Sequence, residues 1–89
     1  MEKERTIVIF RTWKHGKFKG DVDALFPEFN EGNGLMACYA HVGQHGGANY
    51  YYMIKKTRPA TKEEYLPLLE ELKSIGYENI VVYKRRKNK

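Results

Sequence analysis

The sequence has little of what would tie a protein to an oxidising compartment or to a membrane. It has a single cysteine, Cys38, which excludes an internal disulfide and favours a reducing compartment. No apolar run reaches about 18 residues, so no segment is expected to span a membrane. Residues 1–5 are mostly charged and no long apolar stretch follows them, which is atypical of a secretory signal. We therefore expect a cytoplasmic protein that has no membrane partner.

Acidic residues are too few to balance the basic ones, and the imbalance lies at one end of the chain. The sequence has 16 lysines and arginines against 11 acidic residues, which gives a formal net charge of +5. Five of these basic residues occupy the last six positions: Lys84, Arg85, Arg86, Lys87 and Lys89. We therefore expect one electrically neutral domain over residues 1–83 and a basic tail over residues 84–89. Such a tail either contacts phosphate groups or only helps to keep the protein in solution.

Apolar residues recur at spacings that predict five strands and one helix. The strands are predicted at residues 6–13, 22–26, 35–42, 49–56 and 79–83. Residues 6–13 are apolar on both faces, which indicates a central strand, whereas Pro27 predicts that the second strand ends there or lies at an edge. Turns are predicted at residues 14–17 and 31–34.

The helix is predicted by its two ends and by its apolar stripe. Thr61 and Glu64 have the spacing of a capping box, and Gly76 stands where a helix usually ends. The stripe consists of Tyr65, Leu68, Leu69, Leu72 and Ile75. Pro67 predicts a kink or a late start of this helix.

The order of elements, β-β-β-β-α-β, is typical of an α+β fold. We expect an antiparallel sheet of about five strands with one helix on one face. One helix leaves the other apolar face uncovered, so a homodimer is expected to bury that face.

Polar, flexible and aromatic residues are concentrated in residues 41–52, which include two of the three histidines. The run His45-Gly46-Gly47 is predicted to form a turn between two strands, because glycine adopts backbone conformations closed to other residues. The turn would present Gln44 and His45 to solvent, with His41 on the strand below. The simpler interpretation is a hairpin whose polar residues are only solvated.

Neither a metal centre nor an active site is favoured by this segment. Cys38, His41 and His45 have a C-x2-H-x3-H spacing, but Cys38 and His41 would point to opposite faces of a strand. Since no second cysteine pair is present, we expect no metal and no other cofactor. No acidic residue lies in residues 41–52 to orient a histidine, so a binding protein is favoured over an enzyme.

Nucleic-acid binding is the function that these features favour most, without a preference for DNA or RNA. The tyrosines would line one sheet face and stack on bases, polar side chains would contact base edges, and the tail would follow phosphates. The expected interface comprises Tyr39, Tyr50, Tyr52, His41, Gln44, His45, Asn49, Lys84, Arg85, Arg86 and Lys87. The tyrosines would equally suit ordinary half-buried strand positions, and no RNA-recognition or helix-turn-helix signature is present.

Three short motifs support a different context. They are Ala24-Leu25-Phe26-Pro27-Glu28, the run HVGQHG at residues 41–46, and Arg58-Pro59-Ala60-Thr61 followed by Glu64-Tyr65. Together they resemble a family of small uncharacterised bacterial proteins of the kind found in phages and other mobile elements. The resemblance implies a phage or host cytoplasm and no catalytic residue. It suggests, as the alternative function, a protein that binds and modulates a host protein through Trp13, Tyr50 and Tyr52.

Overall fold

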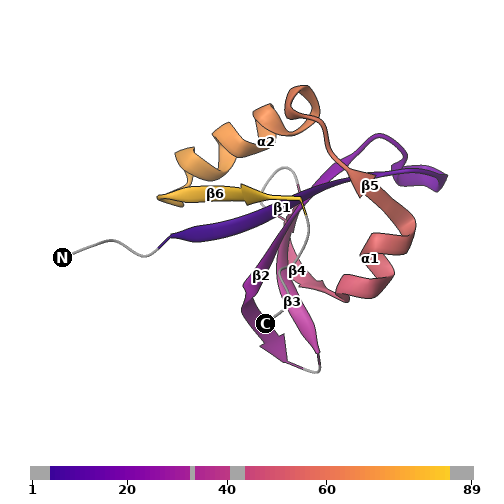
Figure 1. The fold of residues 1–89 in the computed structure, drawn as a ribbon, viewed down its shortest axis with the longest axis horizontal. Helices are drawn as coiled ribbons and strands as arrows, with labels where there is room; N and C mark the ends of the chain where they lie inside the picture. The colour runs from indigo at the N-terminus through magenta and orange to yellow at the C-terminus, as the bar shows by residue number, and fades with distance from the viewer. Residues whose placement is uncertain (1–4, 33, 41–43, 85–89) are drawn as a thin grey trace.

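The computed structural model describes residues 5–32, 34–40 and 44–84, which form an α+β fold with a mostly antiparallel sheet (Figure 1). In chain order the elements are β1 (Thr6–Trp13), the 3-10 turn η1 (Gly16–Phe18), β2 (Val22–Gly32), β3 (Leu35–Ala40), β4 (Gln44–Ala48), α1 (Tyr50–Lys56), β5 (Thr57–Pro59), α2 (Lys62–Ser74) and β6 (Ile80–Tyr83). The sheet order is β4-β3-β2-β1-β5, and β6 also pairs with β1. The α+β class and the mostly antiparallel sheet predicted from the sequence are confirmed.

Strand β1 is an interior strand of this sheet, paired on both edges, which agrees with the central position that its apolar faces predicted. One edge of β1 pairs with β2, antiparallel. The other edge pairs first with β6, in parallel, and then with the short antiparallel strand β5. Every residue of β1 between its two ends is buried, because neighbours lie on both edges and on both faces.

The sheet has a hydrophobic core on each face, not on one face only. The larger core joins Val8, Phe10 and Tyr39 of the sheet to Leu68 and Leu72 of α2. The smaller core lies on the other face and joins sheet residues to Met53 of α1. Figure 1 shows α1 and α2 on opposite sides of β1. The expectation of a single helix is therefore wrong, and α1 covers much of the face that a second copy of the chain was expected to bury. The homodimer stays a prediction.

Helix α2 begins and ends where its sequence signals predicted. The Thr61 hydroxyl accepts a hydrogen bond from the backbone N–H of Glu64 at 3.2 Å, and the Glu64 carboxylate accepts the N–H of Thr61 at 2.9 Å. After the helix, Gly76 has φ +114°, a conformation that glycine adopts without strain. The apolar stripe packs into the larger core except at Ile75, which is half-exposed.

Removing the Thr61 cap is expected to destabilise the fold measurably. The Thr61→Ala variant deletes the oxygen that accepts the Glu64 N–H, so we expect a loss of ~1 kcal/mol in the free energy of unfolding, measured by urea denaturation followed by circular dichroism. Thr61→Ser keeps a hydroxyl at the same position and serves as the control. Equal stability of Thr61→Ala and the wild type would contradict the role of the cap.

Strand β2 continues past Pro27 and pairs with both β1 and β3, contrary to the expectation that it would end at Pro27 or lie at an edge. Its pairing with β3 shifts register between Phe26 and Asn30, so the residues around the proline are not paired regularly. Such a bulge tolerates proline, which has no N–H to donate to the ladder. The strand then reaches Gly32, and positive φ angles at Gly32 and Gly34 form the predicted turn into β3.

The prediction of a strand over residues 49–56, preceded by a glycine turn, is wrong. The run Gln44–Ala48 is itself strand β4, and Gly46 and Gly47 pair with Cys38 and Ala37 of β3. Residues 50–56 form helix α1 instead.

Within the described residues, no helix has both the length and the apolar character needed to cross a bilayer.

Candidate nucleic-acid interface

The first turn of α1 is held by Asn49, one of the residues expected to contact bases. Its side-chain oxygen accepts a hydrogen bond from the backbone N–H of Tyr52 at 3.0 Å. This bond satisfies one of the donors that every helix leaves unpaired at its N-terminus. The Asn49 side chain therefore caps α1 and fixes the backbone at Tyr52.

The last turn of α1 is held by Arg11, a residue that the sequence analysis did not single out. The Arg11 guanidinium donates hydrogen bonds to the Thr57 carbonyl at 2.7 Å, to the Thr57 hydroxyl at 2.9 Å and to the Ile54 carbonyl at 3.4 Å. A cation is favourable beside the C-terminal carbonyls of a helix. Arg11 is only 5% exposed, and this burial lowers its pKa, an effect partly opposed by Tyr50. The signal in the sequence was an arginine at an apolar position of β1.

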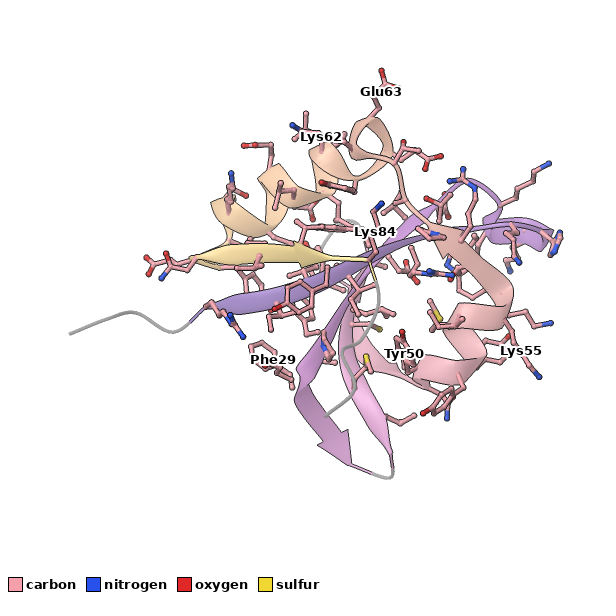
Figure 2. The ribbon with its side chains drawn as sticks, viewed as in Figure 1. Phe29, Tyr50, Lys55, Lys62, Glu63 and Lys84 are labelled. Atoms are coloured by element: carbon pink, nitrogen blue, oxygen red, sulfur yellow. The ribbon has the colours of Figure 1, made fainter. Side chains whose placement is uncertain are left out.

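The contacts at the two ends of α1 fix which face of this helix points to solvent. Met53 is buried in the smaller core, and Tyr50 packs against the same core. The exposed face has two tyrosines and two lysines at i, i+4 spacing: Tyr51, Tyr52, Lys55 and Lys56. Figure 2 shows Lys55 pointing away from the sheet, whereas Tyr50 lies between α1 and the strands.

The exposed rings of α1 lie beside positive charges. Tyr51 is 67% exposed and Tyr52 is 53% exposed. The Lys56 ammonium lies 5.8 Å from the centre of the Tyr52 ring, a cation–π distance. Together these side chains combine flat aromatic surface with groups that attract phosphate.

A second segment lies at the end of α1. The backbone N–H of Lys14, just after β1, donates to the Lys56 carbonyl at 3.2 Å, so Lys14 lies at the end of α1. The Lys14 side chain is exposed, and Lys17 and Lys19 follow in the same exposed loop, with Asp21 as its acidic member. We name the set Lys14, Tyr51, Tyr52, Lys55 and Lys56 the tyrosine–lysine surface. It brings together two segments that are far apart in the sequence.

Tyr39 does not share a face with the other two predicted tyrosines, which corrects the expectation of a tyrosine-lined sheet. Tyr39 is 1% exposed, lies in the larger core, and its hydroxyl donates a short hydrogen bond to the Glu71 carboxylate of α2. Tyr50 and Tyr52 belong to a helix on the opposite face. Of the three, Tyr52 alone is exposed to solvent.

Several residues of the predicted interface are not described by the structure, or are described only in their backbone. His41, Arg85, Arg86 and Lys87 lie outside the described residues. The backbones of Gln44 and His45 pair with Ala40 and Tyr39 across the β3–β4 ladder, while their side chains lie outside the description. Lys84 is exposed directly after β6.

The metal question concerns the same region of the chain. Cys38 is partly buried against the smaller core. In the described part of the chain, no three histidine, cysteine, aspartate or glutamate side chains are grouped to hold a metal ion. His41 and the side chain of His45 fall outside that part.

Sequence reasoning missed Tyr51, Lys55 and Lys56 because residues 49–56 were interpreted as a strand. It missed Lys14 because only the folded chain places that residue beside α1. In a strand, Tyr51 and Lys55 share a face with Met53. In a helix, the i, i+4 pairs Tyr51–Lys55 and Tyr52–Lys56 lie on a different face from Met53. This i, i+4 spacing was the signal in the sequence that could have indicated a helix.

In comparisons with known proteins, no protein-family model, no curated protein and no solved structure matches this chain. The resemblance to small bacterial and phage proteins therefore stays a prediction that rests on the sequence motifs. The tyrosine–lysine surface and the basic tail support the function proposed next.

Proposed function

We propose that the protein is a non-enzymatic binding protein that binds single-stranded nucleic acid on the tyrosine–lysine surface. The single observation that supports this most is the pairing of two exposed tyrosine rings with lysines one helical turn away, next to Lys14. Bases stack on such rings, and lysines neutralise the phosphates that accompany them. Stacking contributes ~1–3 kcal/mol per base and does not depend on base identity, so little sequence preference is expected.

The basic tail completes this proposal in the way the sequence suggested. It contains five of the 16 basic residues and follows β6 directly. Its expected role is to add phosphate contacts for any nucleic acid, whatever the base sequence. Preference for single strands would then come from Tyr51 and Tyr52 and not from the tail.

The proposal is tested by fluorescence anisotropy with labelled single-stranded DNA, duplex DNA and RNA at two salt concentrations. We expect tighter binding to single strands than to duplex, and affinity that falls as salt rises. Binding no tighter than that of a peptide with the sequence of residues 84–89 would overturn the proposal. The alternative, a host-protein partner held by the same exposed tyrosines, would then be the better explanation, because an apolar interface depends little on salt.

Removing the exposed rings is expected to lower single-strand affinity without changing its salt dependence. Tyr51→Leu and Tyr52→Leu keep an apolar side chain on α1 but remove the stacking platform, so each lost stack should cost ~1–3 kcal/mol of binding free energy. The slope of log affinity against log salt should not change, because stacking releases no counterions. The same anisotropy titration measures both quantities.

Phe29→Leu is the matched control for the two tyrosine variants. Phe29 is also an exposed aromatic residue, but it lies on β2, well away from Lys55 in Figure 2. Its replacement should leave affinity unchanged. An equal loss of affinity in Phe29→Leu would show that the rings of α1 have no specific role.

A further inference from the structure

A cavity of ≈ 690 Å³ opens beside the first turns of α2, where the loop between β1 and β2 meets that helix. Its volume lies in the range that accommodates small organic ligands. Its walls come from the ends of β1 and β3, from the loop, from the start of β2 and from α2. Val22, Ala40, Pro67 and Leu68 supply apolar surface, and two aromatic rings and three carboxylates also line the cavity. Nucleic-acid binding as proposed above makes no use of this cavity.

The aromatic part of the wall is a pair of rings set at an angle. The ring centres of Trp13 and Phe18 lie 5.9 Å apart, and the ring planes are inclined by 48°. The Trp13 indole N–H donates to the Asp23 carboxylate at 3.1 Å, which fixes the indole against β2. Phe18 is half-exposed in the 3-10 turn, so part of its ring is accessible to a ligand.

The acidic part of the wall is supplied by Asp21 and Asp23. Burial raises the pKa of Asp23; the Trp13 hydrogen bond opposes this, and the negative charge of Asp21 adds to it. Both carboxylates line the cavity, and their like charges repel each other. A positive charge between them would relieve that repulsion and offset the burial of Asp23.

Glu64, the third acidic residue of the wall, already forms an ion pair within the chain. The Arg58 guanidinium binds it through two parallel hydrogen bonds, one of them 2.8 Å long, and this pairing lowers the pKa of Glu64 to about 2. The negative charge available to a ligand is thus that of Asp21 and Asp23. A cation already approaches the cavity from within the chain, since the Lys17 ammonium lies 5.7 Å from the centre of the Phe18 ring.

We propose that this cavity binds an organic cation, an ammonium or guanidinium group on a short aliphatic stem. The charged head lies against Asp21, Asp23 and the two rings, because carboxylates and aromatic faces both attract cations. The stem lies against Val22 and Leu68, where its apolar surface leaves water. A free polyamine and the side chain of a lysine or arginine in a peptide share this chemistry. An anion is disfavoured by the two carboxylates.

The chain contains its own reporter for this proposal. Trp13 is the only tryptophan in the sequence and it lines the cavity, so its fluorescence reports on occupancy. The full chain is titrated with butylamine and with butylguanidine, and butanol serves as the neutral probe of the same length. We expect a saturable change in fluorescence with both cations and none with butanol. Saturation by butanol at the same concentration would show an apolar cavity without charge recognition and would overturn the proposal.

Substitutions separate the charge from the shape of the cavity. Asp23→Asn keeps an acceptor for the Trp13 N–H but removes the charge, so it should weaken cation binding about tenfold. Lys17→Met removes the competing ammonium and should strengthen binding about twofold to threefold. Glu70→Gln, on an exposed position of α2, removes an equal charge elsewhere and should change nothing. Unchanged affinity in a folded Asp23→Asn variant would overturn the proposal.

The same assay distinguishes the two sources of the cation. Spermidine is compared with a blocked lysine peptide and a blocked arginine peptide. Tighter binding of spermidine points to a free polyamine, and tighter binding of a peptide points to a protein partner. Failure of all three to bind would overturn the proposal, even if butylamine produced a weak signal.

Discussion

Replacing Leu72 with alanine is expected to remove a large part of the stability of this protein. Leu72 is 0% exposed and joins α2 to the larger core, where Tyr39 and Phe26 are also buried. Deleting a buried leucine side chain leaves a cavity and typically costs ~2–5 kcal/mol. The whole free energy of unfolding of a domain is about 5–15 kcal/mol, and a small domain lies near the lower end. Urea denaturation followed by circular dichroism measures the loss.

Leu66→Ala provides the matched control on the same helix. Leu66 is 41% exposed, so truncating it removes little buried surface and should change the free energy of unfolding by less than about 1 kcal/mol. Both variants keep the helix propensity of alanine, and the difference between them therefore reports burial alone. Losses of similar size at Leu66 and Leu72 would contradict the placement of α2 on the sheet.

The second large effect is expected from the lysines of α1. The double variant Lys55→Gln and Lys56→Gln removes two positive charges from the tyrosine–lysine surface. If each lysine neutralises one phosphate, affinity for single strands should fall about tenfold, and the salt slope should flatten by about one and a half units. Glutamine is used because a negative charge in the last turn of α1 would also disturb the helix dipole. Anisotropy titrations across a salt series measure both effects.

A control with the same change in net charge is available on α2. Lys62 and Lys73 lie at the two ends of that helix, and both side chains are exposed. The control is the double variant Lys62→Gln and Lys73→Gln. This double variant should retain nearly the wild-type affinity and slope. If both double variants lost affinity equally, nucleic acid would be attracted by net charge alone, and the tyrosine–lysine surface would have no special role.

The two proposals make independent demands on the chain. Nucleic-acid binding is proposed to require Tyr51, Tyr52 and the lysines of α1, and cation binding is proposed to require Trp13 and Asp23. The Asp23→Asn variant should therefore bind nucleic acid normally, and Tyr52→Leu should bind butylamine normally. A variant that lost both activities would indicate a change in the fold.

The candidate site was predictable only in part, and the reason lies in one ambiguous segment. In residues 50–56, Tyr50, Tyr52 and Ile54 satisfy the period of a strand, while Tyr50, Met53 and Ile54 satisfy the period of a helix. Tyrosine and isoleucine favour strands in isolation, so local preference pointed to the wrong element. A helix was indicated by Asn49, because asparagine is a good helix N-cap. A seven-residue helix is nevertheless marginal unless tertiary contacts stabilise it.

The sequence by itself determined the elements whose signals are local. Strand β1 is apolar on both faces, and α2 has a capping box at Thr61 and a glycine at position 76, so both were placed correctly with their ends. These signals depend on neighbours within a few residues, and no distant contact is needed to interpret them.

Only the tertiary structure decided the form of residues 44–56. Strand β4 exists because β3 pairs with it, although Gly46 and Gly47 have little preference for a strand. Helix α1 exists because Arg11 of β1 binds its C-terminal carbonyls and because Met53 is buried in the smaller core. The Arg11 bonds join residues more than forty positions apart, and the free energy of such tertiary contacts outweighs local preferences of a few tenths of a kcal/mol per residue. The exposed face of α1, and with it the tyrosine–lysine surface, follows from those distant contacts.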